Sequence, residues 1–221
     1  MDMNQLADGL IQYLMLVGLL TFHEFGHAWT ALKCGDDTAK SLGRVSLNPL
    51  VHIDPIGTVL MPMLMLFLPL IYGSSGTAIS HFIVGWAKPV PVNPQNLRNR
   101  GFDEILVTMA GPGMNLLLAI GLVALAKGGI LLHSLAGGMY FLQAAWLSLL
   151  LCFFNLIPIP PLDGSKVLRV VTGMSWEAYM TFSQFGIFAV ILVIQIPQVR
   201  DTLASTTNGT LELLCRIFGV L

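Results

Sequence analysis

The sequence predicts an all-α, polytopic membrane protein that forms a single domain over residues 1–221. Apolar residues make up 55% of the chain and charged residues only 10%, whereas a soluble domain carries about 25% charged residues. Several apolar runs approach the roughly 20 residues that a helix needs to cross a bilayer. The net charge of −1 gives no basis for binding nucleic acid. We expect about five to six transmembrane helices, with a short strand or re-entrant region near the functional site.

The first half of the chain contains one clear span and a shorter apolar pair. Residues 9–33 form the span. No basic stretch or small-residue cleavage site precedes it, so we expect it to be retained rather than removed as a signal peptide. A polar loop follows over residues 34–55. Residues 56–72 are apolar, and residues 77–87 are too short to cross alone, so we expect them to return as a short helix or a re-entrant segment.

The second half contains longer apolar runs separated by proline-rich breaks. Pro89 and Pro91 exclude a helix in the loop over residues 88–101. Apolar composition then predicts three spans, namely residues 103–126, 138–157 and 176–197. Residues 207–221 are expected to form a short amphipathic or membrane-dipping helix. We place the core of the domain at about residues 9–170 and additional C-terminal helices at residues 171–221.

The distribution of lysine and arginine predicts how the chain is oriented, because these residues concentrate in cytoplasmic loops. If residues 56–87 leave one membrane face and return to it, most of the basic residues lie on that face, namely Lys33, Lys40, Arg44, Lys88, Arg98, Arg100, Lys166 and Arg169. We therefore expect a multi-pass protein of the cell membrane with its N-terminus outside.

His23, Glu24 and His27 form an HExxH motif within the first predicted span. Residues four apart share a helix face, so both imidazoles can bind one zinc ion at about 2.0–2.1 Å. The intervening glutamate can accept the proton of an attacking water and pass it to a leaving amine. Polar residues merely packed in a bundle are the alternative, which is disfavoured because ionisable groups inside a span are costly. We expect one zinc ion per chain.

A catalytic zinc site usually has three protein ligands, so a third ligand must come from elsewhere. The candidates are His52, Asp54, His81, His133 and Asp163. Asp163 is favoured because a proline-rich break can turn the chain back after an apolar helix, and Gly164 allows close backbone approach. From the residues alone, an N-cap for a helix that starts near Lys166 is an equally good interpretation of Asp163.

Four segments of the chain together resemble the site-2 protease family of intramembrane zinc metalloproteases. They match in order and spacing over most of residues 20–170, and they are HEFGHAWTALKCGDDTAKSLGRVSLNPLVHIDPIGT (23–58), GWAKPVPVNPQNLRNR (85–100), AGPGMN (110–115) and FNLIPIPPLDG (154–164). The form resembled is the compact bacterial one, which has no inserted PDZ domain.

This resemblance implies roles for several of the residues named above. His23, His27 and Asp163 are expected to bind zinc, and Glu24 to act as general base and acid. Asn155 matches an asparagine that is expected to hydrogen-bond the substrate carbonyl or the oxyanion, with an interhelical hydrogen bond as the alternative. The active site is expected toward the cytoplasmic side, because His27 and Asp163 adjoin the loops rich in lysine and arginine.

The resemblance also implies a substrate-docking edge at Val45, Ser46 and Leu47, within the segment GRVSLNP (43–49). A helix must unwind before its backbone can be cut, and an unwound backbone in the membrane needs new hydrogen-bond partners. A strand edge supplies them when the substrate pairs with it as an added strand.

His52, Asp54 and Asn115 have less certain roles. His52 and Asp54 are candidates for hydrogen bonds that support a ligand histidine or for control of water entry, and loop capping near the membrane surface is the alternative. Asn115 lies at the start of a span beside small residues, so we expect it to take part in helix packing or to form a polar contact between helices, with a position near the site as a further option.

The sequence therefore predicts an intramembrane zinc metalloendopeptidase that cuts peptide bonds within or near the transmembrane segments of membrane-anchored substrates. Its expected partners are a membrane-spanning peptide or protein and the lipid bilayer of a bacterial inner or plasma membrane. The alternatives are a metal-binding membrane transporter that uses the same histidine pair, and an inactive homologue that binds membrane segments. A transporter has no use for Glu24 between the ligands of an open site.

Overall fold

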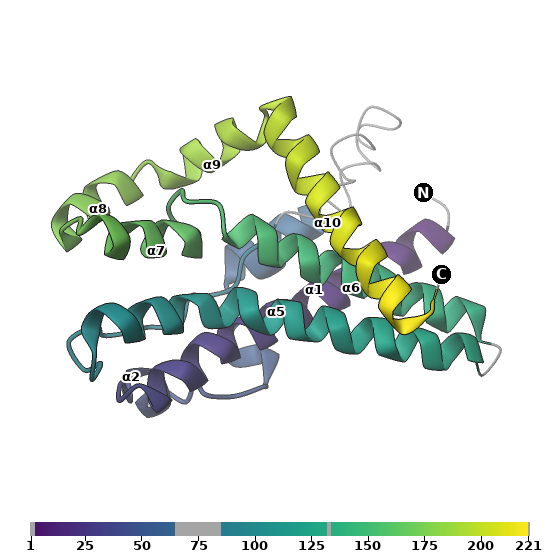
Figure 1. Cartoon of the computed structure of the whole chain (residues 1–221), viewed down its shortest axis with the longest axis horizontal. Coiled ribbons are helices and arrows are strands. Elements are labelled where there is room, and N and C mark those ends of the chain that lie inside the picture. The colour runs from purple at the N-terminus through teal and green to yellow at the C-terminus, as the bar shows by residue number, and fades with distance from the viewer. Residues whose placement is uncertain (1–2, 65–84, 132–133, 221) are drawn as a thin grey trace.

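The structure, a computed structural model, describes residues 3–64, 85–131 and 134–220. Within these ranges it is nearly all helical and contains no strand, which confirms the all-α prediction. Three helices in the described part are long and apolar enough to cross a membrane, and they are α1 (Met3–Lys33), α5 (Arg100–Leu131) and α6 (Leu135–Asn155). All three run through the body of the molecule (Figure 1).

The number of spans differs from the sequence prediction. The described residues give three candidate spans, or up to four if one bent pair of helices counts as a span, so the expected total of about five to six is not confirmed. The apolar pair expected over residues 56–87 falls largely outside the described residues. Of it, η2 (Pro55–Leu60) is a π-helical segment, and the apolar helix that contains it reaches Leu64.

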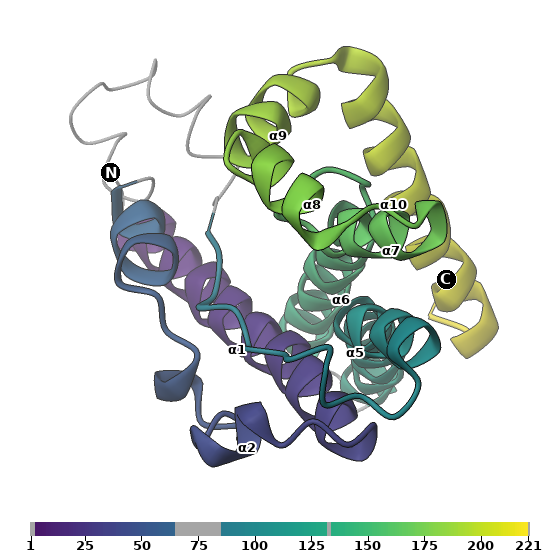
Figure 2. The same cartoon turned by 90° about the vertical axis from the view of Figure 1, so that its left-hand side faces the viewer.

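Helices α5 and α6 form the centre of the bundle. Their contact contains Ala119 and Val123 from α5 and Ala145 and Leu149 from α6, all with no exposed surface. Small residues at such a contact let two backbones approach closely, which is how helices associate in lipid. Figure 2 shows α1 on one side of this pair and α10 (Pro197–Phe218) on the other.

Helix α1 crosses α5 at the HEFGH motif. Gly26 lies at the crossing, and a Cβ atom added there would be only 2.7 Å from the carbonyl oxygen of Ala110. Only a residue without a side chain permits this approach. The crossing therefore brings both histidines of the motif against α5.

After α6 the chain turns into three shorter helices, α7 (Asp163–Thr172), α8 (Trp176–Ser183) and α9 (Gly186–Ile194). The span expected over residues 176–197 is not confirmed as one straight helix, because α8 and α9 meet at a bend of 58° and cross a membrane only if this bent pair counts as one span. Gly186 at this bend packs so closely on the turn before α7 that an added Cβ would lie 2.3 Å from the Pro160 carbonyl oxygen.

Helix α10 is longer than the helix expected over residues 207–221. It begins at Pro197, a favoured first helical residue, and ends at Gly219, whose φ of 64° is the left-handed conformation typical of a helix end. The N-terminal half of α10 is polar, so a search for apolar runs does not detect this part of the helix. One of these polar side chains, Asn208, accepts a hydrogen bond of 2.8 Å from the Trp146 indole of α6.

The short strand expected at Val45–Leu47 is not confirmed, since these residues form bends between α2 (Thr38–Ser41) and η1 (Pro49–Val51). Local hydrogen bonds occupy Ser46. Its carbonyl oxygen lies 2.8 Å from His52 Nε2, and its hydroxyl oxygen accepts from the Asn48 backbone N–H at 3.1 Å. These bonds stabilise a compact loop rather than an open strand.

Residues 85–97, which we call the strap, contain no regular helix or strand, turn at 94–96 and run beside α1 (Figure 2). Hydrogen bonds hold the strap near both ends. At one end, the Arg44 guanidinium donates to the Lys88 carbonyl oxygen at 2.6 Å. At the other end, the buried carboxylate of Asp36 accepts from the Asn93 backbone N–H at 2.7 Å and from the Asn96 amide at 3.0 Å. These bonds tie the strap to the loop that follows α1.

Burial on its own would raise the pKa of the Asp36 carboxyl, but the hydrogen bonds from Thr38, Asn93 and Asn96 hold this pKa below its ordinary value. The charged form is therefore the one that fastens the strap.

Replacing Asp36 should loosen this end of the strap. Because hydrogen bonds to a charged group contribute about 1.5–3 kcal/mol, Asp36→Ala should lower the free energy of unfolding in detergent by about that amount. Asp37→Ala, at an exposed neighbouring carboxylate, should change it by about 0.5 kcal/mol or less. Equal effects of the two substitutions would contradict this role of Asp36.

The stabilisation by Asp36 should also depend on pH. Since the pKa of the folded state lies below the unfolded value of about 3.9, the stabilisation is complete above the unfolded pKa and is lost as the pH falls through the folded pKa. Thermal unfolding between neutral and acidic pH should therefore show a smaller stability loss for Asp36→Asn than for the wild type.

Candidate metal centre

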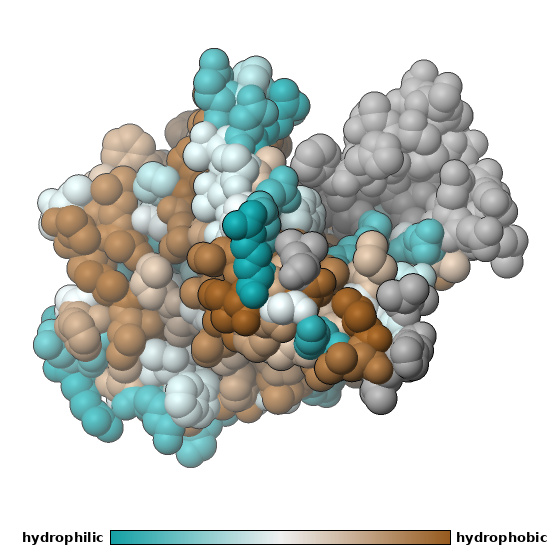
Figure 3. All heavy atoms as spheres, turned by 45° about the vertical axis from the view of Figure 1, so that its right-hand side comes forward, coloured by the Kyte–Doolittle hydropathy of each residue, from teal (hydrophilic) through white to brown (hydrophobic). Residues whose placement is uncertain are grey.

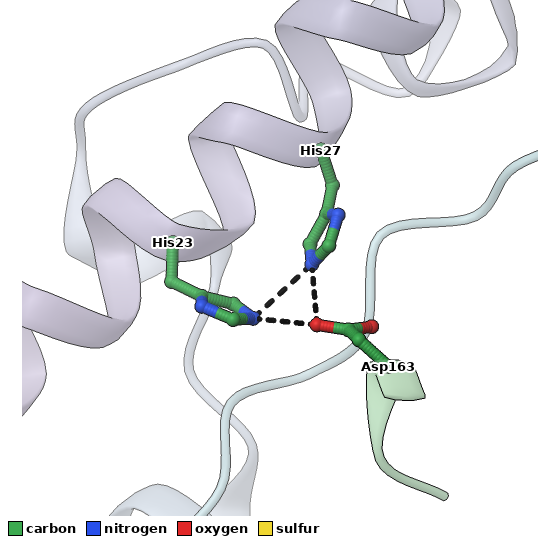
Figure 4. Close-up of side chains that lie close together, drawn as sticks. All are labelled: His23, His27 and Asp163. Atoms are coloured by element: carbon green, nitrogen blue, oxygen red, sulfur yellow. Dashed lines mark hydrogen bonds and ion pairs between the residues drawn. The ribbon is translucent and has the colours of Figure 1, made fainter. Parts of the chain in front are cut away.

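Three buried side chains from two helices converge at one point, and these are His23 and His27 of α1 and Asp163 at the start of α7. The Nε2 atoms of the two imidazoles are 3.1 Å apart. Asp163 Oδ2 lies 3.2 Å from His23 Nε2 and 3.1 Å from His27 Nε2. Figure 4 shows both rings pointing from α1 toward the carboxylate.

The chain brings Asp163 to α1 through the turn that follows α6. A Cβ atom added at Gly164 would lie 2.2 Å from the Leu156 carbonyl oxygen, so this turn closes tightly on itself at a glycine. The N-cap of α7 is Leu162, and Asp163 is the first residue of the helix. Asp163 thus faces the imidazoles instead of capping a helix that starts further along the chain.

Hydrogen bonds fix which atoms face the centre. His27 Nδ1 lies 2.7 Å from the carbonyl oxygen of Val107 on α5. A carbonyl oxygen can only accept, so Nδ1 carries the proton and the neutral ring has its free lone pair on Nε2. Lys166 Nζ donates to Asp163 Oδ1 at 2.9 Å, which leaves Oδ2 as the oxygen that faces the histidines. Burial alone would lower the pKa of Lys166, but the Asp163 carboxylate raises it above its ordinary value.

This arrangement fits a zinc ion. Ligand atoms at about 2.0–2.1 Å around a tetrahedral zinc ion are separated by about 3.3 Å, and the three distances between the ligand atoms are 3.1, 3.1 and 3.2 Å. Two imidazole nitrogens and one carboxylate oxygen are the donor types of catalytic zinc sites, which keep a fourth position open. His23, His27 and Asp163 would hold the ion.

Glu24 is next to His23 in the motif but is not one of the three residues whose ligand atoms converge, which we call the ligand triangle (His23, His27 and Asp163). It is partly exposed, and its Oε2 accepts a hydrogen bond of 2.8 Å from the Val90 backbone N–H of the strap. The second carboxylate oxygen is left to accept from another donor. The strap therefore positions the one acidic side chain that the motif places next to the metal ligands.

Gly111 on α5 closes the other side of the histidine pair. An added Cβ atom would lie 2.3 Å from His27 Nε2 and 2.6 Å from His23 Nε2. Val107, Gly111 and Asn115 are each four residues apart, so they share one face of α5, and Asn115 Nδ2 lies 3.2 Å from His23 Nδ1. The sequence indicated helix packing for Gly111, and for Asn115 helix packing or a polar contact with a position near the site left open. Contact with a ligand histidine was not predicted, because nothing in the pattern connects either residue with a histidine on another helix.

The side-chain hydrogen bonds of the remaining predicted site residues lie within their own helix or loop, and none of these residues belongs to the ligand triangle. Asn155 is the last residue of α6, and its Nδ2 donates to the Leu151 carbonyl oxygen at 2.9 Å. Val45, Ser46 and Leu47 lie in the loop that His52 braces.

His52 and Asp54 are held by loop contacts. The His52 carbonyl oxygen accepts from the Lys88 backbone N–H at 2.9 Å. Asp54 caps η2 by accepting from the Ile56 and Gly57 backbone N–H groups at 3.0 and 2.7 Å. The contacts of both residues match the loop-capping alternative, and neither belongs to the ligand triangle.

Comparison with known proteins gives one family and several relatives. The family model described as peptidase family M50 matches residues 132–196. YwhC of Bacillus subtilis, provisionally named a zinc metalloprotease, is 37% identical over 222 residues, which cover 96% of this chain and 93% of YwhC. Rip2 of Mycolicibacterium smegmatis, provisionally named in the same way, is 29% identical over 82% of this chain and 65% of its own. Rip2 of Mycobacterium tuberculosis is 35% identical over 68% of this chain and 52% of its own length. No solved structure gives a significant match.

A substitution at Gly111 should test the position of the metal. Gly111→Ala should abolish metal retention, because its Cβ would occupy the space in front of both ligand nitrogens. Gly113→Ala, two residues along the same helix where an added Cβ meets nothing within 4 Å, should keep the wild-type metal content. Metal analysis of the purified variants by mass spectrometry makes the comparison. Wild-type zinc content in Gly111→Ala would show that the ion lies elsewhere.

Proposed function

Since this chain belongs to peptidase family M50 and is a zinc metallopeptidase of the site-2 protease type, we propose that it hydrolyses peptide bonds within or near the transmembrane segments of membrane-anchored proteins. The observation that carries the proposal is the position of the ligand pair. His23 and His27 are buried near the centre of the bundle, on a helix long and apolar enough to cross a membrane. Ionisable residues at such positions are expensive and usually functional.

His23, His27 and Asp163 hold the zinc ion in this proposal. When bound there, the ion would act as a Lewis acid and would lower the pKa of a water molecule to about 7. Glu24 accepts the proton of the attacking water and delivers it to the leaving amine. The Val90 N–H supports this role, because it holds Oε2 in place and leaves Oε1 to receive the proton.

Asn155 is proposed to stabilise the substrate carbonyl as negative charge develops on it. An asparagine amide has two N–H donors, and the Leu151 carbonyl oxygen uses one of them. The second can donate to the substrate. Asn155 is the last residue of α6, and the turn that follows it leads to Asp163 at the start of α7. The proposed donor and the third ligand are therefore joined by one short turn.

The substrate is proposed to bind in an extended form along Val45, Ser46 and Leu47. An unwound backbone in the membrane needs polar partners, and this loop offers backbone groups close to the strap. The Ser46 carbonyl oxygen is already engaged by His52, so Val45 and Leu47 are the residues left to pair with the substrate.

The active site is proposed to face the cytoplasmic side of a bacterial cell membrane. The Arg98 backbone N–H donates to the Cys34 carbonyl oxygen at 3.1 Å, and the Arg44 guanidinium donates to the Lys88 backbone carbonyl oxygen. The basic residues of two loops therefore lie near the end of α1. Lys127 lies at the far end of α5, where it donates to Gly219. In the view of Figure 3, apolar side chains cover much of the surface, with hydrophilic ones at the top, at the lower left and in a few places in the middle. The position of the basic residues at the end of α1 agrees with the bias of such residues toward the cytoplasm.

Replacement of Glu24 separates catalysis from metal binding. Glu24→Gln should keep zinc at the wild-type content but lower the rate of cutting a transmembrane peptide by about 100-fold or more, because the proton acceptor is lost. Glu177→Gln, at an exposed glutamate of α8, should leave both unchanged. Mass spectrometry of peptide fragments and metal analysis provide the readouts. Undiminished cutting by Glu24→Gln would contradict the proposed mechanism.

A further inference from the structure

Asn115 is a buried polar side chain that the mechanism does not use. Its residue has no exposed surface, and it lies on α5, which is long and apolar enough to span a membrane. Burying an amide without hydrogen-bond partners is costly, and in lipid no water can supply them. A buried asparagine at this depth therefore needs a structural or functional partner.

The contacts of Asn115 divide between two helices. Its backbone carbonyl oxygen accepts from the Ser148 hydroxyl of α6 at 2.7 Å. Its side chain points instead to α1, where Nδ2 is 3.2 Å from His23 Nδ1. A residue that served only to join α5 and α6 would not need an amide side chain, because the bond to Ser148 uses the backbone.

The chemistry of His23 decides which amide atom faces it. Its Nε2 lies in the triangle with His27 and Asp163, so this nitrogen must be unprotonated to bind a metal. The proton of the neutral ring is then on Nδ1, which becomes a donor. The Asn115 NH₂ group cannot accept that proton. Among the described residues, Asn115 Oδ1 has no hydrogen-bond partner.

Half a turn of the amide about the Cβ–Cγ bond gives His23 Nδ1–H an acceptor and Oδ1 a partner, and it places the NH₂ group at the position without a partner. It exchanges Oδ1 and Nδ2 in nearly the same space, so Oδ1 accepts from His23 Nδ1–H at the distance that the structure gives for Nδ2. We propose that Asn115 is a positioning residue which, through this hydrogen bond, fixes the tautomer and the ring orientation of the zinc ligand His23.

This role of Asn115 has a counterpart on the same helix. The carbonyl oxygen of Val107 accepts from His27 Nδ1 at 2.7 Å, and Val107 and Asn115 flank Gly111 on one face of α5. One helix thus orients both imidazoles, through a backbone acceptor at one and a side-chain acceptor at the other. Hydrogen bonds of this kind to the second nitrogen of a ligand histidine raise its basicity and fix its geometry.

The inference rests on the zinc site of the proposed function, and its test measures zinc affinity without substrate. In detergent-solubilised full-length protein, Asn115→Ala should bind zinc about 10- to 100-fold more weakly in competition with a chelator. Asn115→Asp, which keeps an acceptor for Nδ1–H, should recover most of this loss. Thr21→Val should change little, since the buried Thr21 hydroxyl on the ligand helix bonds to its own helix, at the Val17 carbonyl oxygen.

Nuclear magnetic resonance of protein labelled with ¹⁵N-histidine gives a second measurement, the position and resonance of the His23 ring proton. This resonance would not change if Asn115 had a purely structural role. In the zinc-loaded wild type, His23 should carry its proton on Nδ1, and the resonance of this proton should shift in Asn115→Ala. Wild-type zinc affinity in Asn115→Ala, failure of Asn115→Asp to recover affinity, or a His23 proton on Nε2 would each overturn the inference. If zinc affinity differs among the variants as expected but the zinc-loaded wild type does not cut transmembrane peptides, the result counts against the proposed function alone.

Discussion

The metal centre depends on the close approach of α1 to α5. Gly26 on α1 meets the Ala110 backbone, and Gly111 on α5 meets the ligand nitrogens, each at a distance that excludes a side chain. This approach lets α5 reach the Nδ1 atoms of both histidines. Inside a membrane, polar groups without partners are costly, so a histidine pair on a spanning helix is stable only beside a helix that can hydrogen-bond it.

The remaining elements organise around this crossing. The small-residue contact between α5 and α6 holds α6 in place, and the turn after α6 returns Asp163 to α1. The strap connects the loop after α1 to Glu24, with Asp36 and Arg44 as its two anchors. The histidines of α1 contact α5 and Asp163, whereas the carboxylate of Glu24, the proposed general base, contacts the strap. A change in the strap can therefore alter Glu24 without moving the histidines.

The sequence predicted the features that have local signatures. The spacing of His23 and His27 predicts a shared helix face, and long apolar runs predict α1, α5 and α6. The residues alone favoured Asp163 among several candidates but left an N-cap as an equal alternative, and the family resemblance then decided for the ligand. Spacing says nothing about a ligand 136 residues beyond His27. The comparisons support that resemblance, and the structure brings Asp163 to the histidines.

Other features could not be predicted because they depend on contacts between distant segments. The partner of Asn115 is 92 residues away on another helix. The bend between α8 and α9 lies where Gly186 packs on Pro160, although the apolar pattern there is continuous. The polar half of α10 is stabilised against α6 and lacks the apolar run of a span. The strand expected at Val45–Leu47 from the family resemblance is not confirmed, because Ser46 bonds within its own loop.

X-ray absorption spectroscopy at the zinc edge tests the ligand set most directly. The zinc-loaded protein should show two imidazole nitrogens and one carboxylate oxygen at about 2.0–2.1 Å, and no sulfur. Asp163→Ala should change the spectrum by the loss of one protein oxygen, with both imidazoles retained. A sulfur neighbour at about 2.3 Å, or a spectrum that Asp163→Ala leaves unchanged, would show that His23, His27 and Asp163 do not together bind the metal.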